Sequence, residues 1–208
     1  NIGLANEMAL ICDRLDINVW EVIDAAATKP FGFMAHYPGP GIGGHCIPLD
    51  PHYLSWKARL SGYEPKFISL ATEINGAMPH HVVDIVSRAL NDESKSIRGS
   101  KILILGVAYK PNVSDFRESP SLEVIEMLLE RGALISYSDP YVPEILLDKG
   151  TLVHRELNAH SLSESDCVLI LTHHRDFDYT EVVNHSRLTV DTRNVTRNLV
   201  EQGNIHYL

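Results

Sequence analysis

Hydrophobic residues in the first ninety positions recur at helical spacing. The earliest series is Leu4, Met8, Ile11 and Leu15, and this period of three to four residues predicts an amphipathic helix that runs to about Arg14. The chain begins with Asn rather than Met and is in helical register from its fourth residue. We therefore expect it to be part of a longer protein.

Capping signals predict a second helix. Asn18 and Glu21 have the spacing of a capping box, and Ile17 with Val22 matches the hydrophobic staple that often accompanies it. This helix should end before the Lys-Pro pair at 29–30, because a residue that precedes proline disfavours helical backbone.

Two further helices should follow. Asp50 and Pro51 match an N-cap followed by proline at the first helical position, and the helix that they open should stop near Gly62. A long stretch with helical periodicity covers 67–90, and Pro79 should break or kink it. Residues 1–92 are therefore predicted to form an all-helical domain.

The pattern changes after a polar linker at 91–100. Short apolar runs, typical of buried strands, then alternate with helical segments. Strands are expected at 101–105, 133–137, 167–172 and 188–191, and an amphipathic helix at 121–131. This alternation predicts an α/β fold over 97–208, a doubly wound, Rossmann-like parallel sheet with helices on both faces.

Basic residues follow the carboxyl ends of two predicted strands, where doubly wound sheets bind their ligands. Lys110 and Arg117 come after the first strand, and Arg193 comes after the last. If they converge at one edge of the sheet, they would suit phosphate groups, which Arg binds bidentately. The alternative is three separate, solvated surface charges.

Composition narrows the classes of partner and location. The chain has 208 residues and a net charge of −9, which disfavours nucleic acid and anionic membranes as partners because both require a basic face. No apolar run approaches the roughly 20 residues of a transmembrane helix. The three cysteines are odd in number and far apart, so we expect no disulfide framework and a cytoplasmic location.

Cys46 lies at the end of a loop with the sequence PGPGIGGHCI, at 38–47. Glycine lets the backbone approach a ligand closely, and proline stiffens the turn. A thiol at the lip of such a loop is placed for nucleophilic attack. The alternative is a buried packing cysteine, which is the role that we assign to Cys12 and Cys167.

The neighbours of this cysteine have more than one interpretation. Asp50 can cap a helix and also orient water beside the thiol. His45 can lower the pKa of the thiol or simply line the loop, since adjacent side chains of an extended segment point apart. The histidines lack metal-ligand spacing, so no metal site is expected. The GxGxxG fingerprint of a dinucleotide site is also missing from this sequence.

Two segments carry a family resemblance: GPGIGGHCIPLD at 39–50 and GVAYKPNVSDFRESP at 106–120. In this order they resemble the nucleotide-sugar 6-dehydrogenases, the UDP-glucose/GDP-mannose dehydrogenase family. The resemblance covers essentially the whole chain, as the helical central domain that forms the family's dimer core, followed by its UDP-binding C-terminal domain. The family's N-terminal NAD-binding domain and a catalytic lysine expected shortly before Asn1 are not in this sequence.

The resemblance implies oxidation of the C6 alcohol of a UDP-sugar to a carboxylate with two NAD+. Cys46 matches the family's nucleophile, which forms a thiohemiacetal and then a thioester, and Asp50 matches a carboxylate that assists water. Arg117 matches a residue that reaches the NAD pyrophosphate. The positions that match substrate-binding residues are Ala35, His36, Tyr37, Pro38, Gly39, Gly43, Lys110 and Arg193.

Departures from the pattern of UDP-glucose enzymes bear on the substrate. Leu49 stands where those enzymes tend to have lysine, and Lys-Pro-Phe at 29–31 stands where they have arginine. The pattern is more similar to the enzymes that oxidise UDP-N-acetylglucosamine or UDP-N-acetylmannosamine for surface polysaccharides. Three alternatives remain: a UDP-glucose 6-dehydrogenase, a non-catalytic nucleotide-sugar-binding and dimerisation fragment, and a hydrolase that uses Cys46 with a histidine base.

Overall fold

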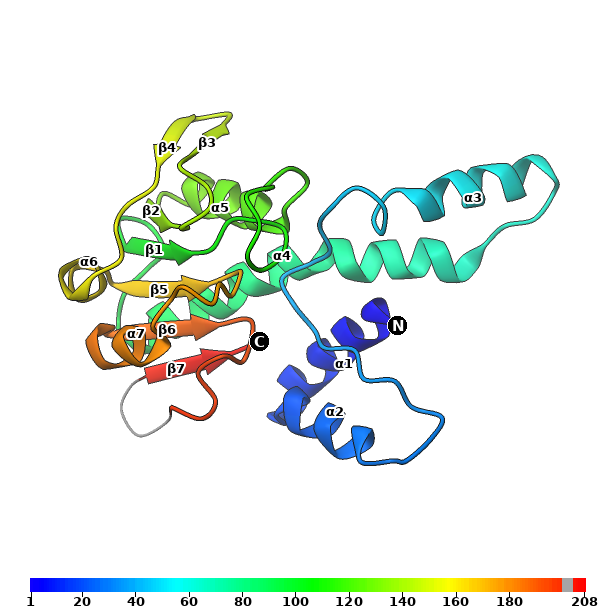
Figure 1. Ribbon diagram of the computed structural model, residues 1–208, viewed down its shortest axis with the longest axis horizontal. Coiled ribbons are helices and arrows are strands. Elements are labelled where there is room, and N and C mark those ends of the chain that lie inside the picture. Colours follow the sequence, from blue (N-terminus) through cyan, green and yellow to red (C-terminus); the bar gives the residue numbers. More distant parts are fainter. Residues whose placement is uncertain (200–203) are drawn as a thin grey trace.

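The computed structural model describes residues 1–199 and 204–208 and joins a helical half to a five-stranded sheet (Figure 1). The helices are α1 (Ile2–Leu15), α2 (Val19–Ala27), α3 (Asp50–Leu60), α4 (Lys66–Asp92), α5 (Pro120–Glu130), α6 (Ala159–Glu164) and α7 (Tyr179–His185). The strands are β1 (Lys101–Leu105), β2 (Leu134–Ser138), β3 (Glu144–Leu147), β4 (Gly150–Val153), β5 (Cys167–Ile170), β6 (Leu188–Asp191) and β7 (Asn204–Tyr207).

The first two helices form where the sequence predicts them. Asn18 caps α2, because its side-chain oxygen accepts the backbone N–H groups of Trp20 and Glu21 at 2.9 and 3.4 Å. The buried faces of α1 and α2 form a small apolar cluster that includes Cys12. The assignment of Cys12 as a packing residue is confirmed.

The start of α3 differs from the sequence prediction. The helix begins at Asp50 with Leu49 as its N-cap, and no side chain caps it. The chain already turns at Cys46, whose carbonyl oxygen accepts the Asp50 N–H at 2.8 Å. This bond draws Asp50 into the helix, so its predicted role as the N-cap is wrong.

Helix α4 is continuous for 27 residues, so the predicted break at Pro79 does not occur. Proline inside a helix removes one backbone hydrogen bond and costs about 3 kcal/mol. Met78 and Val82 on either side of Pro79 are fully buried, and burial of each such side chain contributes about 1.5–3 kcal/mol. Packing around the proline therefore offsets the lost bond.

The sheet is parallel throughout, with strand order β2-β1-β5-β6-β7. The chain runs outward from β1 to β2 and then returns to β5, so a topological switch point lies between β1 and β5. The predicted strands and α5 are confirmed. We did not predict β3, β4, β7, α6 and α7. The three strands are not continuously buried, as β5 and β6 are, and the two helices span less than two turns each.

Alternate residues of the central strands face two separate cores. Ile102 and Ile104 of β1 pack with α4 and α5 on one face of the sheet. Leu103 and Leu105 pack with side chains of α6 and α7 on the other. Helices therefore cover both faces, which confirms the doubly wound α/β fold. The C-terminal half of α4 belongs to the core that contains Ile102 and Ile104, so one helix connects the two halves of the chain. The domain boundary between 92 and 97 stays a prediction.

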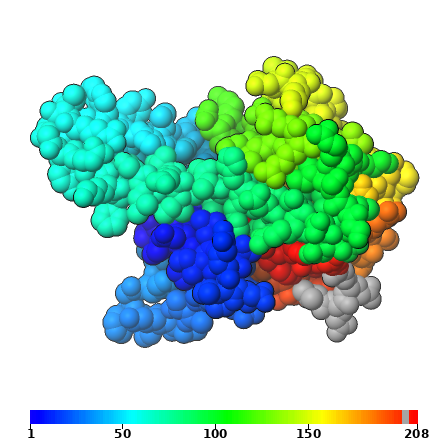
Figure 2. Space-filling view, turned by 180° about the vertical axis from the view of Figure 1, so that it is seen from behind, coloured from blue at the N-terminus to red at the C-terminus, as the bar shows by residue number. Residues whose placement is uncertain are grey.

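Helix α3 and the first half of α4 project from the body as a two-helix arm (Figures 1 and 2). Ser55 is the buried residue of α3, whereas the large apolar side chains of this helix face solvent. An exposed apolar surface of this kind marks an interaction site. The exposed apolar residues of the arm are Tyr53, Leu54, Trp56, Leu60, Tyr63, Phe67 and Leu70.

A pair of glycine variants tests the close packing at the switch point. Gly106 has φ of +79°, and a Cβ there would overlap the Thr172 carbonyl oxygen. Gly99 has nearly the same φ, +83°, but open space around it. Alanine at either position incurs the left-handed penalty of about 1–2 kcal/mol. We expect Gly106→Ala to lower the free energy of unfolding in urea by roughly 2 kcal/mol more than Gly99→Ala. Equal losses would contradict this packing.

Candidate functional site

The glycine-rich loop lies against the carboxyl edge of the sheet. Gly43 and Gly44 approach Tyr109 so closely that a Cβ at either would come within 2.8 Å of its side chain. A Cβ at Gly39 would lie 2.6 Å from a guanidinium nitrogen of Arg193. Because only glycine fits at such contacts, the glycines allow the loop to reach the turns after β1 and β6.

A buried asparagine, which the sequence analysis missed, holds the start of this loop. Asn6 on α1 is fully buried, and its side-chain oxygen accepts the Gly39 N–H at 3.0 Å. Its amide nitrogen donates to the side chain of Asn75 on α4 at 2.8 Å. The signal in the sequence was a polar residue on the face of α1 that also carries Gly3 and Ala9, both of which are buried.

Cys46 is exposed at the lip of the loop, whereas Cys12 and Cys167 are buried. Burial raises the pKa of Cys167 to about 12, so that thiol stays protonated and unreactive. The bond from the Asp50 N–H to the Cys46 carbonyl spans one helical turn, a spacing that puts side chains on the same face. Asp50 is also exposed. A thiol and a carboxylate therefore lie one turn apart in the chain, and both are open to solvent.

His45 reaches the turn after β1. Its Nε2 lies 3.8 Å from the Asp115 carboxylate, and its ring meets the Tyr109 ring edge-on. The Arg117 side chain donates two hydrogen bonds to Asp115 at 3.0 and 2.9 Å. These bonds, with one from the Arg117 backbone, hold the pKa of Asp115 at about 2. The contacts favour the interpretation of His45 as a residue that lines and docks the loop.

Arg193 is held at the floor of the same edge. Its Nε donates to the Leu171 carbonyl at 2.7 Å, and its backbone N–H donates to Asp191 at 2.8 Å. Desolvation lowers the pKa of Arg193 to about 10, although the Asp191 carboxylate opposes this shift. The side chain is still a cation at neutral pH, in surroundings where the attraction between charges is weakly screened.

The structure places the other two basic residues on the turn between β1 and α5. Lys110 is exposed, and its ammonium group lies over the Tyr109 ring, 5.2 Å from the centroid. Arg117 is also exposed and is paired with Asp115. Both follow β1, as Arg193 follows β6, so all three lie toward the carboxyl ends of the strands. Of the three, Arg193 touches the glycine loop.

The segment before the glycines is tied to α2. Tyr37 stacks on Trp20 with ring centroids 5.4 Å apart, and its hydroxyl donates to Asp24 at 2.7 Å. Arg197 from the loop after β6 donates to the same carboxylate at 2.8 Å. The side chain of Tyr37 is thus engaged within the chain. The remaining positions that the family resemblance implies in this segment are partly or fully buried: Ala35, His36 and Pro38.

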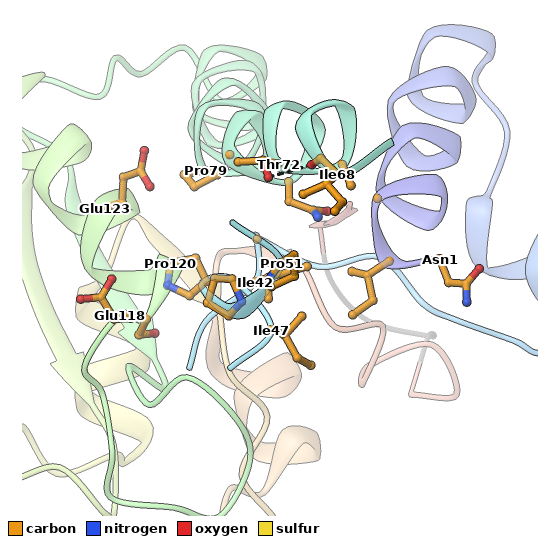
Figure 3. Close-up of a pocket in the computed structure, with 18 of the residues that line it drawn as sticks. Asn1, Ile42, Ile47, Pro51, Ile68, Thr72, Pro79, Glu118, Pro120 and Glu123 are labelled. Carbon is orange, nitrogen blue, oxygen red and sulfur yellow. Dashed lines mark hydrogen bonds between the residues drawn. The ribbon is translucent and has the colours of Figure 1, made fainter. Parts of the chain in front are cut away.

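A cavity of about 860 Å³ lies beside the loop, between α1, α4 and the start of α5 (Figure 3). Ile42 and Ile47 of the loop form one wall, and Pro79 of α4 lies on another (Figure 3). Cys46 is not among its lining residues, although Ile47 follows Cys46 directly. This hollow therefore adjoins the thiol rather than enclosing it.

Two kinds of feature are absent from residues 1–199 and 204–208. No group of three or more His, Cys, Asp and Glu side chains is arranged to hold a metal ion. No helix in these ranges combines the length and apolar character needed to cross a membrane.

Family models match both halves of the chain. Residues 1–77 match the central domain of the UDP-glucose/GDP-mannose dehydrogenase family. Residues 103–198 match the UDP-binding domain of the same family. The two matches leave out most of the C-terminal half of α4, the helix that connects the halves.

Curated relatives agree with this match. A UDP-N-acetyl-D-mannosamine dehydrogenase of Methanococcus maripaludis is 40% identical over 203 residues, which is 94% of this chain and 44% of the relative. A protein with the same name from Campylobacter jejuni is 37% identical over 85% of this chain and 42% of its own length. An NDP-N-acetyl-D-galactosaminuronic acid dehydrogenase of Ralstonia nicotianae is 34% identical over 93% of this chain and 44% of its own. The chain spans less than half the length of each.

Solved structures agree as well. The UDP-D-ManNAc dehydrogenase of Pyrococcus horikoshii superposes with a TM-score of 0.81 at 27% identity, over 99% of this chain and 47% of that one. The UDP-glucose dehydrogenase of Pyrobaculum islandicum superposes with a TM-score of 0.82 at 29% identity, over 100% of this chain and 47% of that one. The motifs, the fold and these relatives lead to one conclusion: the chain belongs to the UDP-glucose/GDP-mannose dehydrogenase family.

Proposed function

We propose that this chain is the thiol-bearing and nucleotide-binding part of an NAD-dependent nucleotide-sugar 6-dehydrogenase. The observation that carries the proposal is Cys46, exposed at the lip of a glycine loop that is seated on the ligand edge of the sheet. Family membership supplies the reaction class: oxidation of the C6 alcohol of a UDP-sugar to the uronate. A cytoplasmic location is part of the same proposal.

The diphosphate binds at the basic edge of the sheet. Lys110 offers an exposed ammonium group, and Arg193 offers a cation held in place by the Leu171 carbonyl. The sugar then lies along 35–43, the segment whose glycines let it pack against Arg193 and Tyr109. The contact between Gly39 and Arg193 supports this arrangement, because it joins the proposed sugar and phosphate sites.

Cys46 explains how one site takes an alcohol to a carboxylic acid. The thiolate adds to the carbonyl carbon of the intermediate aldehyde, and the oxygen gains a proton to give a thiohemiacetal. That carbon still bears a hydrogen, which leaves as hydride while the hydroxyl loses its proton, and a thioester results. Water then attacks the thioester, releasing the acid and the free thiol. Asp50, one turn from Cys46, orients this water.

The cofactor contacts this chain through Arg117. Its guanidinium is exposed, and two of its nitrogens are occupied by Asp115. The third nitrogen of the guanidinium is left to donate to one phosphate of a dinucleotide. NAD+, when bound, accepts the hydride in each of the two oxidations. The relatives are more than twice as long as this chain, and a cofactor domain outside it would complete the site.

The substrate is proposed to be a UDP-N-acetylhexosamine that becomes a precursor of surface polysaccharide. The relatives from Methanococcus and Campylobacter are named for UDP-N-acetyl-D-mannosamine, and this isomer is favoured over UDP-N-acetylglucosamine. Leu49 and the segment 29–31 depart from the UDP-glucose pattern, and these departures also favour a UDP-N-acetylhexosamine. Alone, the chain would act only as a nucleotide-sugar-binding and dimerisation fragment.

Replacement of the nucleophile tests this function. In the complete enzyme, Cys46→Ser should lower acid formation by at least about 10³-fold, because loss of a covalent nucleophile removes most of the rate enhancement. UDP affinity, measured by calorimetry, should stay unchanged. Cys12→Ala, which removes a buried thiol, is the matched control and should keep full turnover. Acid formation at the normal rate by Cys46→Ser would rule out the covalent step.

We also propose that the two-helix arm joins two copies of the chain. An 11-residue helix is marginal on its own, yet α3 buries only Ser55 within the chain. Trp56 is 61% exposed and Phe67 is 88% exposed. A second copy would cover both and supply the packing that α3 lacks. The role of the central domain as the family's dimer core supports the same occupant.

Charge insertion on the arm tests the dimer. Phe67→Asp should shift the mass measured by light scattering from two chains toward one, because a carboxylate cannot be buried without a partner. Leu146→Asp, at a 77% exposed position on β3, is the control and should leave the mass unchanged. A wild-type chain that is monomeric at high micromolar concentration would contradict the proposal.

A further inference from the structure

A buried histidine at the switch point has no role in the function proposed above. The side chains of His174 and Asp139 are both fully removed from solvent, and Nε2 of His174 lies 3.0 Å from the carboxylate. The ring contacts Tyr141 and Phe177, with centroids 5.0 and 5.5 Å away. Packing therefore fixes the orientation of this ring.

The hydrogen bonds of His174 also fix its protonation. Nδ1 lies 3.0 Å from the backbone nitrogen of Asn112 and accepts its N–H, so Nδ1 carries no proton. Nε2 then carries the ring proton and donates it to Asp139. A neutral His174 thus bridges the turn after β1 to the residue that follows β2.

Asp139 binds the same turn through its other bonds. Its Oδ2 accepts the backbone N–H groups of Val107 and Ala108 at 2.7 and 3.1 Å. Burial alone would raise the pKa of Asp139, but the bonds from His174 and the backbone outweigh it and lower the pKa. The carboxylate is therefore ionised and fully bonded, as a buried charge must be.

The turn between β1 and α5 is anchored on both sides of Lys110. On one side, the Ala108 carbonyl accepts the Thr172 hydroxyl at 2.6 Å, and its N–H binds Asp139. On the other side, the Asn112 N–H binds His174, and the Asn112 side-chain oxygen accepts the Arg175 N–H at 3.0 Å. Each anchor is two residues from Lys110.

The backbone conformation of Asn112 shows why the part of the turn after Lys110 needs the histidine. Asn112 has φ of +61°, in the left-handed region, where asparagine is one of the better tolerated residues. The residue is exposed, so without an internal acceptor its N–H would bond to water and the turn would be free to change conformation. The acceptor on His174 is the bond that holds the Asn112 backbone N–H in the observed turn.

We propose that His174 is a positioning residue that holds the turn bearing Lys110 in its binding conformation. The proposal rests on the function above, in which Lys110 binds the diphosphate. A turn that is ordered before the ligand arrives loses less conformational entropy on binding. His174 would raise affinity in this way without touching the ligand.

Two amide variants separate the bonds of the ring. The oxygen of an Asn side chain falls near the place of Nδ1, so His174→Asn keeps an acceptor for Asn112. The amide nitrogen of Gln falls near Nε2, so His174→Gln keeps a donor to Asp139 and loses that acceptor. The readouts are the Kd of UDP by calorimetry and the hydrogen exchange of the Asn112 amide, both on the whole chain.

We expect His174→Gln to weaken UDP binding by about tenfold, the cost of reordering roughly one backbone residue. The Asn112 amide should lose its protection in the same variant, while Val107 and Ala108 keep theirs. His174→Asn should retain both the affinity and the protection to a large degree. Lys110→Ala gives the loss of UDP affinity that is expected when the ammonium group itself is removed.

Ser165→Ala controls for loss of stability. In the wild-type chain the Ser165 hydroxyl donates to the Ser161 carbonyl at 2.7 Å in a buried site. Ser165 lies just before β5, at the end of that strand opposite to His174. The variant should lower Tm without changing the Kd of UDP. If the histidine variants do not fold, Asn112→Gly serves instead: it keeps the φ and the N–H that His174 accepts and removes only the bond to Arg175. It should retain most of the UDP affinity, and a loss as large as that of Lys110→Ala would show that the Arg175 bond, not the histidine, holds the turn.

The outcomes separate the two proposals. Wild-type affinity and a protected Asn112 amide in His174→Gln would overturn the positioning role. Equal loss of affinity in both histidine variants and in Ser165→Ala would also overturn it, because the effect would then follow stability alone. If the wild-type chain does not bind UDP, the proposed function fails, and the Asn112 exchange rates still decide whether His174 orders the turn.

Discussion

The close approach of the glycine loop to the carboxyl edge of the sheet determines where every candidate residue lies. Gly43 and Gly44 meet Tyr109 at distances that leave no room for a side chain, and Gly39 meets the guanidinium of Arg193. Asn6 holds the loop from the opposite side through the Gly39 N–H. A loop fixed at both ends can present its last residues, including the exposed thiol, at one place relative to the basic groups.

The continuity of α4 gives this contact its rigidity. The helix begins in the projecting arm, passes the cavity and ends within the sheet core. Asn75 on α4 binds Asn6 on α1, so the helix that supports the loop also supports the sheet. Relative motion of the two halves would require the burial around Pro79 to be lost. Packing along α4, rather than a flexible linker, therefore joins the helices that hold the loop to the sheet whose edge is proposed to bind phosphate.

The parts of this structure that could be predicted are those with a local signal. Strand β1 is a continuous apolar run, Asn18 precedes an amphipathic segment, and the glycines stand together in the sequence. What could not be predicted depends on contacts between distant residues. Continuity through Pro79 depends on burial, and the placement of Asp50 inside α3 depends on a bond to Cys46.

The same contrast between local signals and contacts between distant residues applies to the candidate site. Cys46 and its exposed position followed from the composition of its loop, and the family match followed from two motifs. Asn6 gave only the signal of a polar residue on the buried face of α1, and such a residue can be interpreted only when its partners are known. His174 gave no local signal. His174 finds those partners 35 and 62 residues away in the chain. Interactions at such separations are fixed by topology, which no local pattern reports.

The central claim is that Cys46 lies where the sugar of a bound UDP-sugar would be. Affinity labelling tests it most directly, with a UDP derivative that carries a haloacetyl group beyond its β-phosphate, followed by peptide mapping. If Cys46 lies beside the sugar, alkylation of Cys46 should precede that of Cys12 and Cys167, and excess UDP should suppress it. Labelling of Cys46 at the same rate with and without UDP would contradict it.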